Sequence, residues 1–289
     1  LKKQTIHNNN MMKRYLLLII CCGVASMMAA QSVYQTYLEN GYDSVRTSIL
    51  TQMYENERNK PNEAKQKKIA KNIQKTYLAE RNDMQEIVLE SDNELITIAH
   101  NLQTVVKNKD YSSIWGCLQA NDTVTDIRKR ENAELLVMEH LYKVSDDISV
   151  EYIKLSDDSV SIYLFDHIFF EKSISGAWKA CMLQILYNYL PKYWHANYNL
   201  KTYIYTADDL TDYIANIRYG KPELQVEQYD VHPRVYANNN RYYIELCYFN
   251  DWTGLVRSIY RVDINNEGEA NIDLVSDVVL HEYRCGVIF

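Results

Sequence analysis

Apolar residues in the first half of the chain recur every three or four positions, which is the spacing of one face of an α-helix. Val45, Ile49 and Met53 show this spacing after Ser44, and the pattern stops at Pro61. Because proline disfavours helical backbone at the preceding residue, this helix should end there. The same spacing predicts further helices at about 62–90, 92–108 and 125–143, with a short segment at 111–118.

The second half of the chain changes to alternating apolar and polar residues, a pattern typical of β-strands. Turn-forming Asn, Asp and Gly residues separate the alternating runs. Two helices interrupt them, one at about 177–190 and one that begins at Thr206 and Asp209 and closes at Gly220. The predicted strands are a hairpin at 148–155 and 160–165, a strand at 200–205, and a series at 223–229, 233–237, 241–249, 252–264, 271–280 and 281–289.

Together the two patterns predict an α+β fold, with an N-terminal helical region followed by a mixed segment and a C-terminal antiparallel β-sheet. The helical region covers 31–145, and the α+β region with its antiparallel sheet covers 146–289. The pattern leaves two arrangements open, because the two regions form either separate domains or two layers of one domain.

Residues 1–30 have the pattern of an upstream extension followed by a secretory signal peptide. Lys13 and Arg14 supply a positive segment, residues 15–25 are apolar, and small residues precede Gln31. This order of charge, apolar run and small residues is typical of a cleaved leader. The apolar run is shorter than the roughly 20 residues of a membrane-spanning helix. We expect cleavage between Ala30 and Gln31 and no stable membrane span afterwards.

Export sets the expected location and partners. The protein should be periplasmic, at the cell surface or secreted, and a lipoprotein acylated at Cys21 or Cys22 is the alternative. The chain has a net charge of −7, and the leader carries basic residues but no acidic ones. The exported part is therefore more acidic than the whole. Nucleic acid is an unsuitable partner, because its phosphates require a basic surface. The candidate partners are therefore a glycan, a peptide or an envelope protein.

No catalytic or cofactor-binding motif is present in the sequence. The chain has only 8 Gly, and neither G-x-G-x-x-G nor G-x-x-x-x-G-K occurs. The zinc motif H-E-x-x-H, the pair C-x-x-C and the serine elbow G-x-S-x-G are absent as well. We therefore predict no cofactor and no catalytic residue, and a protein that is not an enzyme. The open alternative is a secreted hydrolase whose active-site residues are dispersed along the chain.

Four cysteines lie outside the leader and are candidates for disulfide bonds. An oxidising compartment permits disulfides, and four cysteines allow three pairings. The alternative is four buried thiols that pack as small apolar side chains. These candidate disulfide cysteines are Cys117, Cys181, Cys247 and Cys285.

Tyrosine is unusually frequent, with 25 Tyr against 5 Phe and 4 Trp. Tyrosine combines an apolar ring with a polar tip, which suits binding surfaces for sugars, peptides and proteins. The alternative is that these rings pack in a half-buried sheet. We predict a non-enzymatic envelope or extracellular protein that binds or interacts through this region. The candidate binding residues are Tyr189, Tyr193, Trp194, Tyr198 and Trp252.

One loop has some features of a calcium site. Asp263, Asn265 and Glu267 place side-chain oxygens at alternating positions ahead of Gly268. Calcium binds oxygen ligands, and a glycine permits the sharp turn of the loop. Position twelve of an EF-hand would be Leu274, which cannot act as a ligand. A plain hairpin turn is the alternative for this loop.

Overall fold

The computed structural model describes residues 44–107, 113–119, 127–129, 133–140, 149–189, 201–217, 220–238 and 241–286. The chain consists of two compact units, Leu1–Lys60 and Pro61–Phe289. The described part of the first unit is helix α2 (Ser44–Asn59), which confirms the first predicted helix. All other elements below belong to the second unit.

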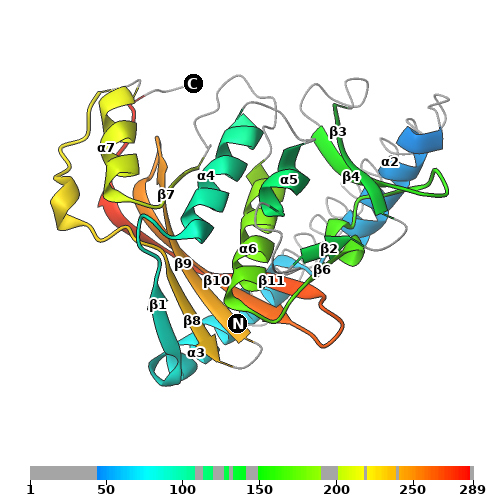
Figure 1. Cartoon of the computed structure of the whole chain (residues 1–289), viewed down its shortest axis with the longest axis horizontal. Helices are drawn as coiled ribbons and strands as arrows, with labels where there is room; N and C mark the ends of the chain where they lie inside the picture. The colour runs from blue at the N-terminus through cyan, green and yellow to red at the C-terminus, as the bar shows by residue number, and fades with distance from the viewer. Residues whose placement is uncertain are drawn as a thin grey trace, which may run out of the picture. The chain divides into compact units, whose positions relative to one another are not determined.

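A six-stranded antiparallel sheet is the framework of the second unit (Figure 1). Its order is β1-β8-β9-β10-β11, and the short strand β7 also pairs with β9. β8 and β7 share one edge of β9, with β8 along 241–245 and β7 along 247–249. The strands are β1 (Gln85–Val88), β7 (Thr202–Ile204), β8 (Arg234–Asn238), β9 (Arg241–Asn250), β10 (Gly254–Ile264) and β11 (Ala270–Glu282).

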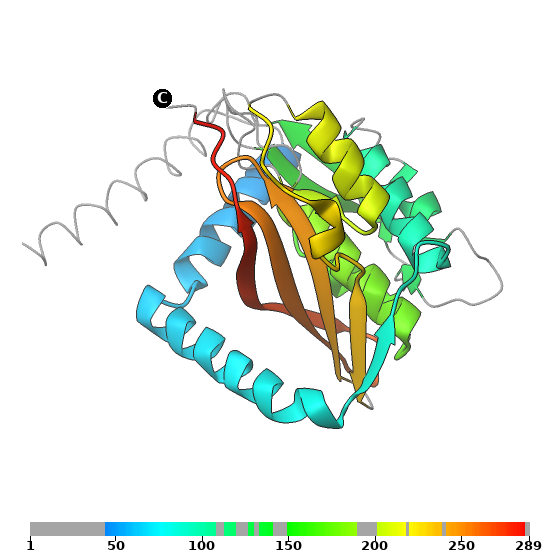
Figure 2. The same cartoon turned by 90° about the vertical axis from the view of Figure 1, so that its left-hand side faces the viewer.

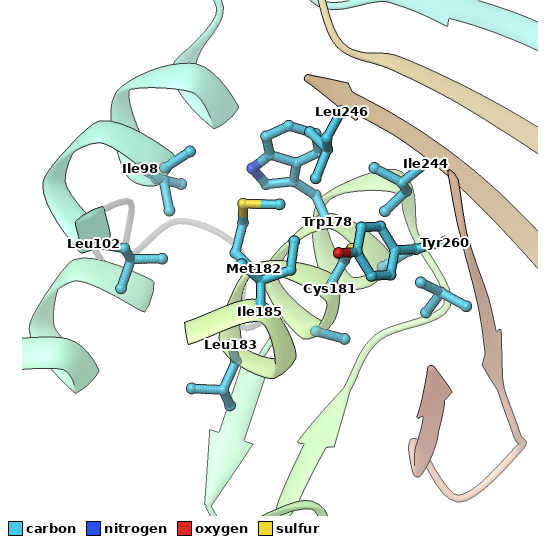
Figure 3. Close-up of a cluster of buried hydrophobic side chains, with 14 of the residues drawn as sticks. Ile98, Leu102, Trp178, Cys181, Met182, Leu183, Ile185, Ile244, Leu246 and Tyr260 are labelled. Atoms are coloured by element: carbon cyan, nitrogen blue, oxygen red, sulfur yellow. The ribbon is translucent and has the colours of Figure 1, made fainter. Parts of the chain in front are cut away.

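Helices α4 (Glu94–Lys107) and α6 (Ile174–Tyr189) cover one face of this sheet, and the main core lies between them and the strands (Figure 3). Trp178 of α6 is fully buried, and its ring N–H donates to the carbonyl of Leu95 at 2.9 Å. Alternate residues of β9, including Ile244 and Leu246, face this core. The apolar run at 177–190 is therefore a helix, as predicted, and it is apolar because it is buried on several sides.

Helix α3 (Glu63–Glu80) covers the opposite face of the sheet, so that Figure 2 shows the strands between α3 and the α4–α6 pair. Ile73 and Tyr77 of α3 pack there against Tyr243 of β9. The same face buries Glu245, whose carboxylate accepts a hydrogen bond from the Tyr77 hydroxyl at 2.6 Å. β9 is thus buried on both faces, so its burial does not alternate.

One end of the sheet is closed by helix α7 (Ala207–Asn216) and by the chain that follows β11. Thr206 and Asp209 form the capping box of α7, as their position at its start requires. Phe249 is fully buried between the rings of Tyr213 and Tyr283, at centroid distances of 4.8 and 5.6 Å. We call this end, with its turn at 251–253, the closed end.

Two small sheets and several short helices complete the described part. β2 (Ile127–Lys129) pairs with β6 (Ile168–Phe170), and β3 (Ala133–His140) pairs with β4 (Ser149–Leu155), which also pairs with β5 (Val160–Ser161). The β4–β5 pairing confirms the predicted hairpin. The remaining elements are α5 (Ile114–Leu118), η1 (Arg81–Asp83), η3 (Leu164–His167) and η5 (Val226–Gln228).

The structure corrects four of the predicted elements. The strands predicted at 271–280 and 281–289 are not separate, because β11 continues through both to Glu282, and residues 283–286 lie outside it. The helix predicted at 125–143 is wrong, because β2 and β3 occupy this segment, and their strand partners outweigh the helical spacing. The helix predicted at 62–90 ends at Glu80, and β1 follows it at the edge of the main sheet. The strand predicted at 223–229 is wrong, since this segment contains the short helix η5.

The α+β fold class is confirmed, with helices in the N-terminal part and the antiparallel sheet in the C-terminal part. The sheet nevertheless joins the regions 31–145 and 146–289, because Gln85 of β1 lies opposite Ala237 of β8. The described parts of these regions therefore share one sheet.

Candidate functional site

A pocket of about 610 Å³ lies at the end of the main sheet opposite the closed end. Here β8 ends, β9 begins, and the hairpin turn 265–269 joins β10 to β11. Helix η3 supplies one further wall. We call this site the hairpin pocket, and its lining residues are Phe165, Asp166, Asn238, Arg241, Asp263, Ile264, Asn265, Glu269, Ala270 and Asn271.

The hairpin turn holds its shape through Asn265 and Gly268. The Asn265 side-chain oxygen accepts the backbone N–H groups of Glu267 and Glu269 at 3.0 and 2.9 Å. Gly268 has a φ of +88°, which side chains disfavour, and a Cβ there would lie 3.0 Å from the carbonyl oxygen of Phe170. The Phe170 N–H donates to the Gly268 carbonyl at 2.7 Å. This bond ties the turn to β6.

A ladder of alternating charges supports the base of the hairpin pocket. Arg241 donates to Glu80 of α3 at 2.9 Å and to Asp263 of β10 at 2.7 Å. Arg261 lies 3.2 Å from the second oxygen of Asp263 and 2.6 Å from Asp273 of β11. The bonds to Asp263 and Glu80 raise the pKa of Arg241 above its ordinary value. Its positive charge is therefore already shared by two carboxylates.

The walls of the hairpin pocket combine an aromatic ring with amides and carboxylates. Phe165 is partly buried and stacks on Phe170 with centroids 5.8 Å apart, and Phe170 is buried in the main core. Asn271 donates its amide N–H to Asp273 at 3.0 Å, which fixes the amide on the sheet. Asn238 and Asp166 are exposed. Such a wall offers an apolar surface beside donors and acceptors of hydrogen bonds.

A smaller pocket of about 300 Å³ lies on the other side of the same turn. Arg128 lines it with its guanidinium 5.0 Å from the ring centroid of Phe169. Lys172 also lines this pocket and bonds to the side chain of Asn266. The turn 265–269 is therefore flanked by hollows on both sides.

The predicted aromatic surface falls mostly outside the described residues. Tyr193, Trp194 and Tyr198 are not described, and Tyr189 is the last residue of α6, with a side chain that is not described. Trp252 lies at the closed end with 41% of its surface exposed. Apart from the exposed Tyr163, the second-half tyrosines whose side chains the structure describes belong to the core or lie against it. Those that are buried are Tyr203, Tyr205, Tyr236, Tyr242, Tyr243, Tyr248, Tyr260 and Tyr283.

The candidate calcium residues have other partners. Asp263 forms ion pairs with Arg241 and Arg261. The Asn265 side-chain oxygen accepts two backbone N–H groups of its own turn. Glu267 is exposed in this turn. Across the described ranges, no group of three or more His, Cys, Asp or Glu side chains is placed to hold a metal ion. A calcium ion here would have to displace these contacts, so the calcium site stays a prediction that the geometry does not favour.

The four cysteines outside the leader are thiols and form no disulfide bond in the structure. Cys181 is buried in the main core and Cys117 lies beside it, whereas Cys247 and Cys285 lie at the closed end. Burial raises the pKa of the Cys181 and Cys247 thiols, which disfavours the reactive thiolate form. Their environment is that of small apolar core residues.

A histidine–aspartate pair joins α4 to α7. The Nε2 atom of His100 lies 2.9 Å from both oxygens of Asp209. The same carboxylate accepts the backbone N–H groups of Tyr205 and Thr206, each at 2.9 Å. The sequence predicted Asp209 at the start of a helix but not its partner, because His100 lies on a separate helix. The pair holds the start of α7 against α4.

Sequence reasoning missed the hairpin pocket because its residues come from separate elements. Phe165 and Asp166 lie in η3, Asn238 ends β8, and Asn271 belongs to β11. No local motif contains them. The available signal was topological, since the turns after β8 and β10 fall at the same end of an antiparallel series.

Comparisons with known proteins found no matching family model, no matching curated protein and no matching solved structure. None of the described helices is both long enough and apolar enough to cross a membrane. The chemistry of the hairpin pocket is therefore the basis for a functional argument.

Proposed function

We propose that this chain is an exported, non-enzymatic binding protein of the envelope or extracellular space, and that the hairpin pocket holds its ligand. The observation that carries the proposal is a pocket of about 610 Å³ whose walls join an aromatic ring to amides and carboxylates. Ligand pockets of roughly 300–1,000 Å³ with a few convergent polar groups are typical of small-molecule recognition.

The rigidity of the walls supports binding. Phe165 is held by its stacking on the buried ring of Phe170, and Asn271 is held by Asp273. Arg241 is held from both sides by carboxylates. A site whose side chains are already fixed loses little conformational entropy when a ligand enters.

The sequence supports the extracellular location. Lys13 and Arg14 precede an apolar run and a group of small residues, which is the order found in secretory leaders. An exported binding protein would meet glycans, peptides or other envelope proteins. Sequencing the N-terminus of protein recovered from the exported fraction tests this part, and we expect it to begin at Gln31. A mature chain that keeps the leader would contradict export, whereas acylation at Cys21 or Cys22 would place the protein on a membrane.

The binding proposal is tested by calorimetric titration of the purified chain with three soluble probes. The probes are neutral hexasaccharides, a hexalysine peptide and polygalacturonate. We expect at least one probe to bind and to be recovered chemically intact. Binding of none of the three would overturn the proposal. Cleavage of a probe, lost in Asp166→Asn, would instead assign a secreted hydrolase.

A blocking variant locates the site without assuming a ligand class. Asn238 is exposed at the rim, so Asn238→Trp should fill the hairpin pocket without removing a core contact. We expect it to weaken binding at least tenfold, while Trp252→Ala at the closed end leaves binding unchanged. If Trp252→Ala abolishes binding and Asn238→Trp does not, the ligand binds at the closed end and the pocket assignment is wrong.

A further inference from the structure

We propose that the hairpin pocket is selective for neutral saccharides over charged ligands. This inference rests on the proposed binding function and names the chemical class of the ligand. Three observations lead to it, namely the charge balance of the lining, the position of one aromatic ring, and the amides beside that ring.

The charge balance opposes anionic ligands. Asp166, Asp263 and Glu269 line the pocket against a single guanidinium, that of Arg241. Arg241 already donates to Asp263 and to Glu80. A phosphate, sulfate or uronate would therefore find no uncommitted cation in this lining. An anion that gives up its hydration without gaining a partner charge binds weakly.

The ladder at the base also weakens the case for a cationic ligand. Asp263 lies between Arg241 and Arg261, so its charge is compensated within the protein. Asp166 is exposed, and water and salt screen its charge. A lysine or arginine side chain entering the pocket would give up its own hydration for carboxylates that are engaged or screened. Such an exchange gains little free energy.

The ring of Phe165 offers a fixed apolar surface in the wall. Its centroid lies 5.8 Å from that of Phe170, with an angle of 28° between the rings. Phe170 is 2% exposed in the main core, so it anchors the stack. The faces of sugar rings carry C–H groups that pack on aromatic rings, since an aromatic face is electron-rich.

The amides of Asn238 and Asn271 supply the matching polar groups. An amide both donates and accepts hydrogen bonds, and so does each hydroxyl of a sugar. Asp166 adds a carboxylate that accepts only, which suits the hydroxyl hydrogens at the edge of a sugar. The combination of one ring, two amides and accepting carboxylates fits an uncharged ligand rich in hydroxyls better than a charged ligand.

The test is calorimetric titration of the full chain with neutral hexasaccharides of glucose, mannose, xylose and N-acetylglucosamine, in parallel with hexalysine and polygalacturonate. We expect at least one neutral probe to bind with an affinity that changes less than threefold between 50 and 500 mM NaCl. Screened charge pairs weaken over this range, whereas neutral contacts do not.

Phe165→Leu keeps an apolar side chain against Phe170 but removes the aromatic face. We expect it to weaken binding of the neutral probe at least tenfold, and Phe165→Tyr to restore it within threefold. Tyr163→Ala is the matched control, because Tyr163 is a nearby aromatic residue with 39% exposure that does not line the pocket.

The possible outcomes separate this inference from the proposed function. Pocket-dependent binding of hexalysine, lost at high salt and in Asp166→Asn, would overturn the saccharide inference and leave the binding function standing. Pocket-dependent binding of polygalacturonate would do the same. Binding of no probe would overturn both. Neutral binding that Phe165→Leu leaves unchanged, with the variant folded by circular dichroism, would also overturn the inference.

Discussion

The two ends of the main sheet are built in different ways. At the closed end, the Cys285 N–H donates to the Asp251 carbonyl at 2.8 Å, and the Tyr213 hydroxyl donates to the Asp251 side chain at 2.8 Å. Helix α7 and the chain after β11 thus both contact the turn 251–253 at Asp251. At the other end, the turn 265–269 is tied to β6 by the bond between Phe170 and Gly268, and pockets lie on both sides.

Under the proposed function, stability and recognition are divided between the two ends of one sheet. The closed end is packed with aromatic rings, and the burial of rings contributes strongly to folding. The end of the sheet that carries the hairpin pocket, which we call the open end, is lined by polar side chains that are fixed by a ladder of ion pairs. The ten residues of β9 separate the two ends by roughly 30 Å. Changes at one end should therefore leave the properties of the other largely intact.

The largest effect is expected when a methyl group is added at the closed end. Gly254 has a φ of +98°, and a Cβ there would lie 2.0 Å from the carbonyl oxygen of His281. Because backbone atoms cannot move aside cheaply, Gly254→Ala should cost more than about 4 kcal/mol of unfolding free energy. In the matched variant Gly268→Ala at the other end of the sheet, the added Cβ would lie 3.0 Å from the nearest backbone atom, the carbonyl oxygen of Phe170. This variant should therefore lose only about 1–3 kcal/mol of unfolding free energy.

Urea denaturation measures both glycine variants. If the two variants lost equal unfolding free energy, the expected difference between the closed end and the open end would be contradicted. Gly268→Ala should in addition weaken ligand binding, because it displaces the turn that lines the hairpin pocket.

Truncation of the central ring at the closed end should have the next largest effect. Phe249 is fully buried between Tyr213 and Tyr283. Phe249→Ala should therefore lower the free energy of unfolding by about 3–5 kcal/mol, as large cavities do. Phe165→Ala is the counterpart at the open end, where the ring is only partly buried. A loss at Phe165 as large as that at Phe249 would show that the open end also carries the fold.

Alkaline pH should destabilise the closed end through Tyr213. Burial, and then the hydrogen bond to Asp251, raise the pKa of Tyr213 above its ordinary value. The folded protein therefore keeps this proton at a pH where the unfolded chain loses it. The stabilisation is complete below about pH 10 and is lost as pH rises further, by at most about 1.4 kcal/mol per pH unit.

Thermal unfolding of the wild type between pH 8 and 11.5 checks this prediction, with Tyr213→Phe as the comparison. The variant should show a shallower decline above pH 10, because it has no hydroxyl to ionise. Other buried tyrosines contribute to the background decline, including Tyr243, whose pKa burial raises to about 12. Parallel pH profiles for the two proteins would contradict the assignment to Tyr213.

The smallest effect is expected at the surface of the closed end. Trp252 is 41% exposed, so Trp252→Ala should change the free energy of unfolding by about 0.5 kcal/mol or less. Binding of the neutral probe should also be unchanged. A loss of binding with an unchanged unfolding curve would move the recognition surface to the closed end.

The main elements of the fold follow from the sequence where local signals and tertiary contacts agree. Thr206 and Asp209 mark the start of α7, and the apolar run of α6 matches its buried surroundings. The prediction fails at 125–143, where apolar residues at helical spacing belong to β2 and β3. It also fails after Glu80, where β1 joins the sheet. In both places pairing with another strand decides the structure, and the helical spacing of the segment itself does not show this.

The candidate site was less predictable than the fold. Tyrosine content drew attention to a surface, but the buried rings of Tyr243 and Tyr248 belong to the sheet. The sequence predicts a calcium loop or a plain hairpin turn at Asp263 and Asn265, and the structure has a hairpin turn that begins at Asn265. The contacts of Asp263 with Arg241 and Arg261 join separate positions of β9 and β10, so no local pattern predicts them. A pocket that depends on five separate elements becomes visible only when the elements are placed.

The pairing of β1 with β8 also determines when the protein can fold. The partners Gln85 and Ala237 are far apart along the chain, so the edge of the sheet cannot form until most of the chain has been synthesised. Contacts between such distant residues slow folding, to times of roughly milliseconds to seconds in sheet-rich proteins. A chain that completes its fold late remains extended for longer after leaving the ribosome. Under the proposed export, that delay favours passage through a translocation channel before the sheet closes on the far side.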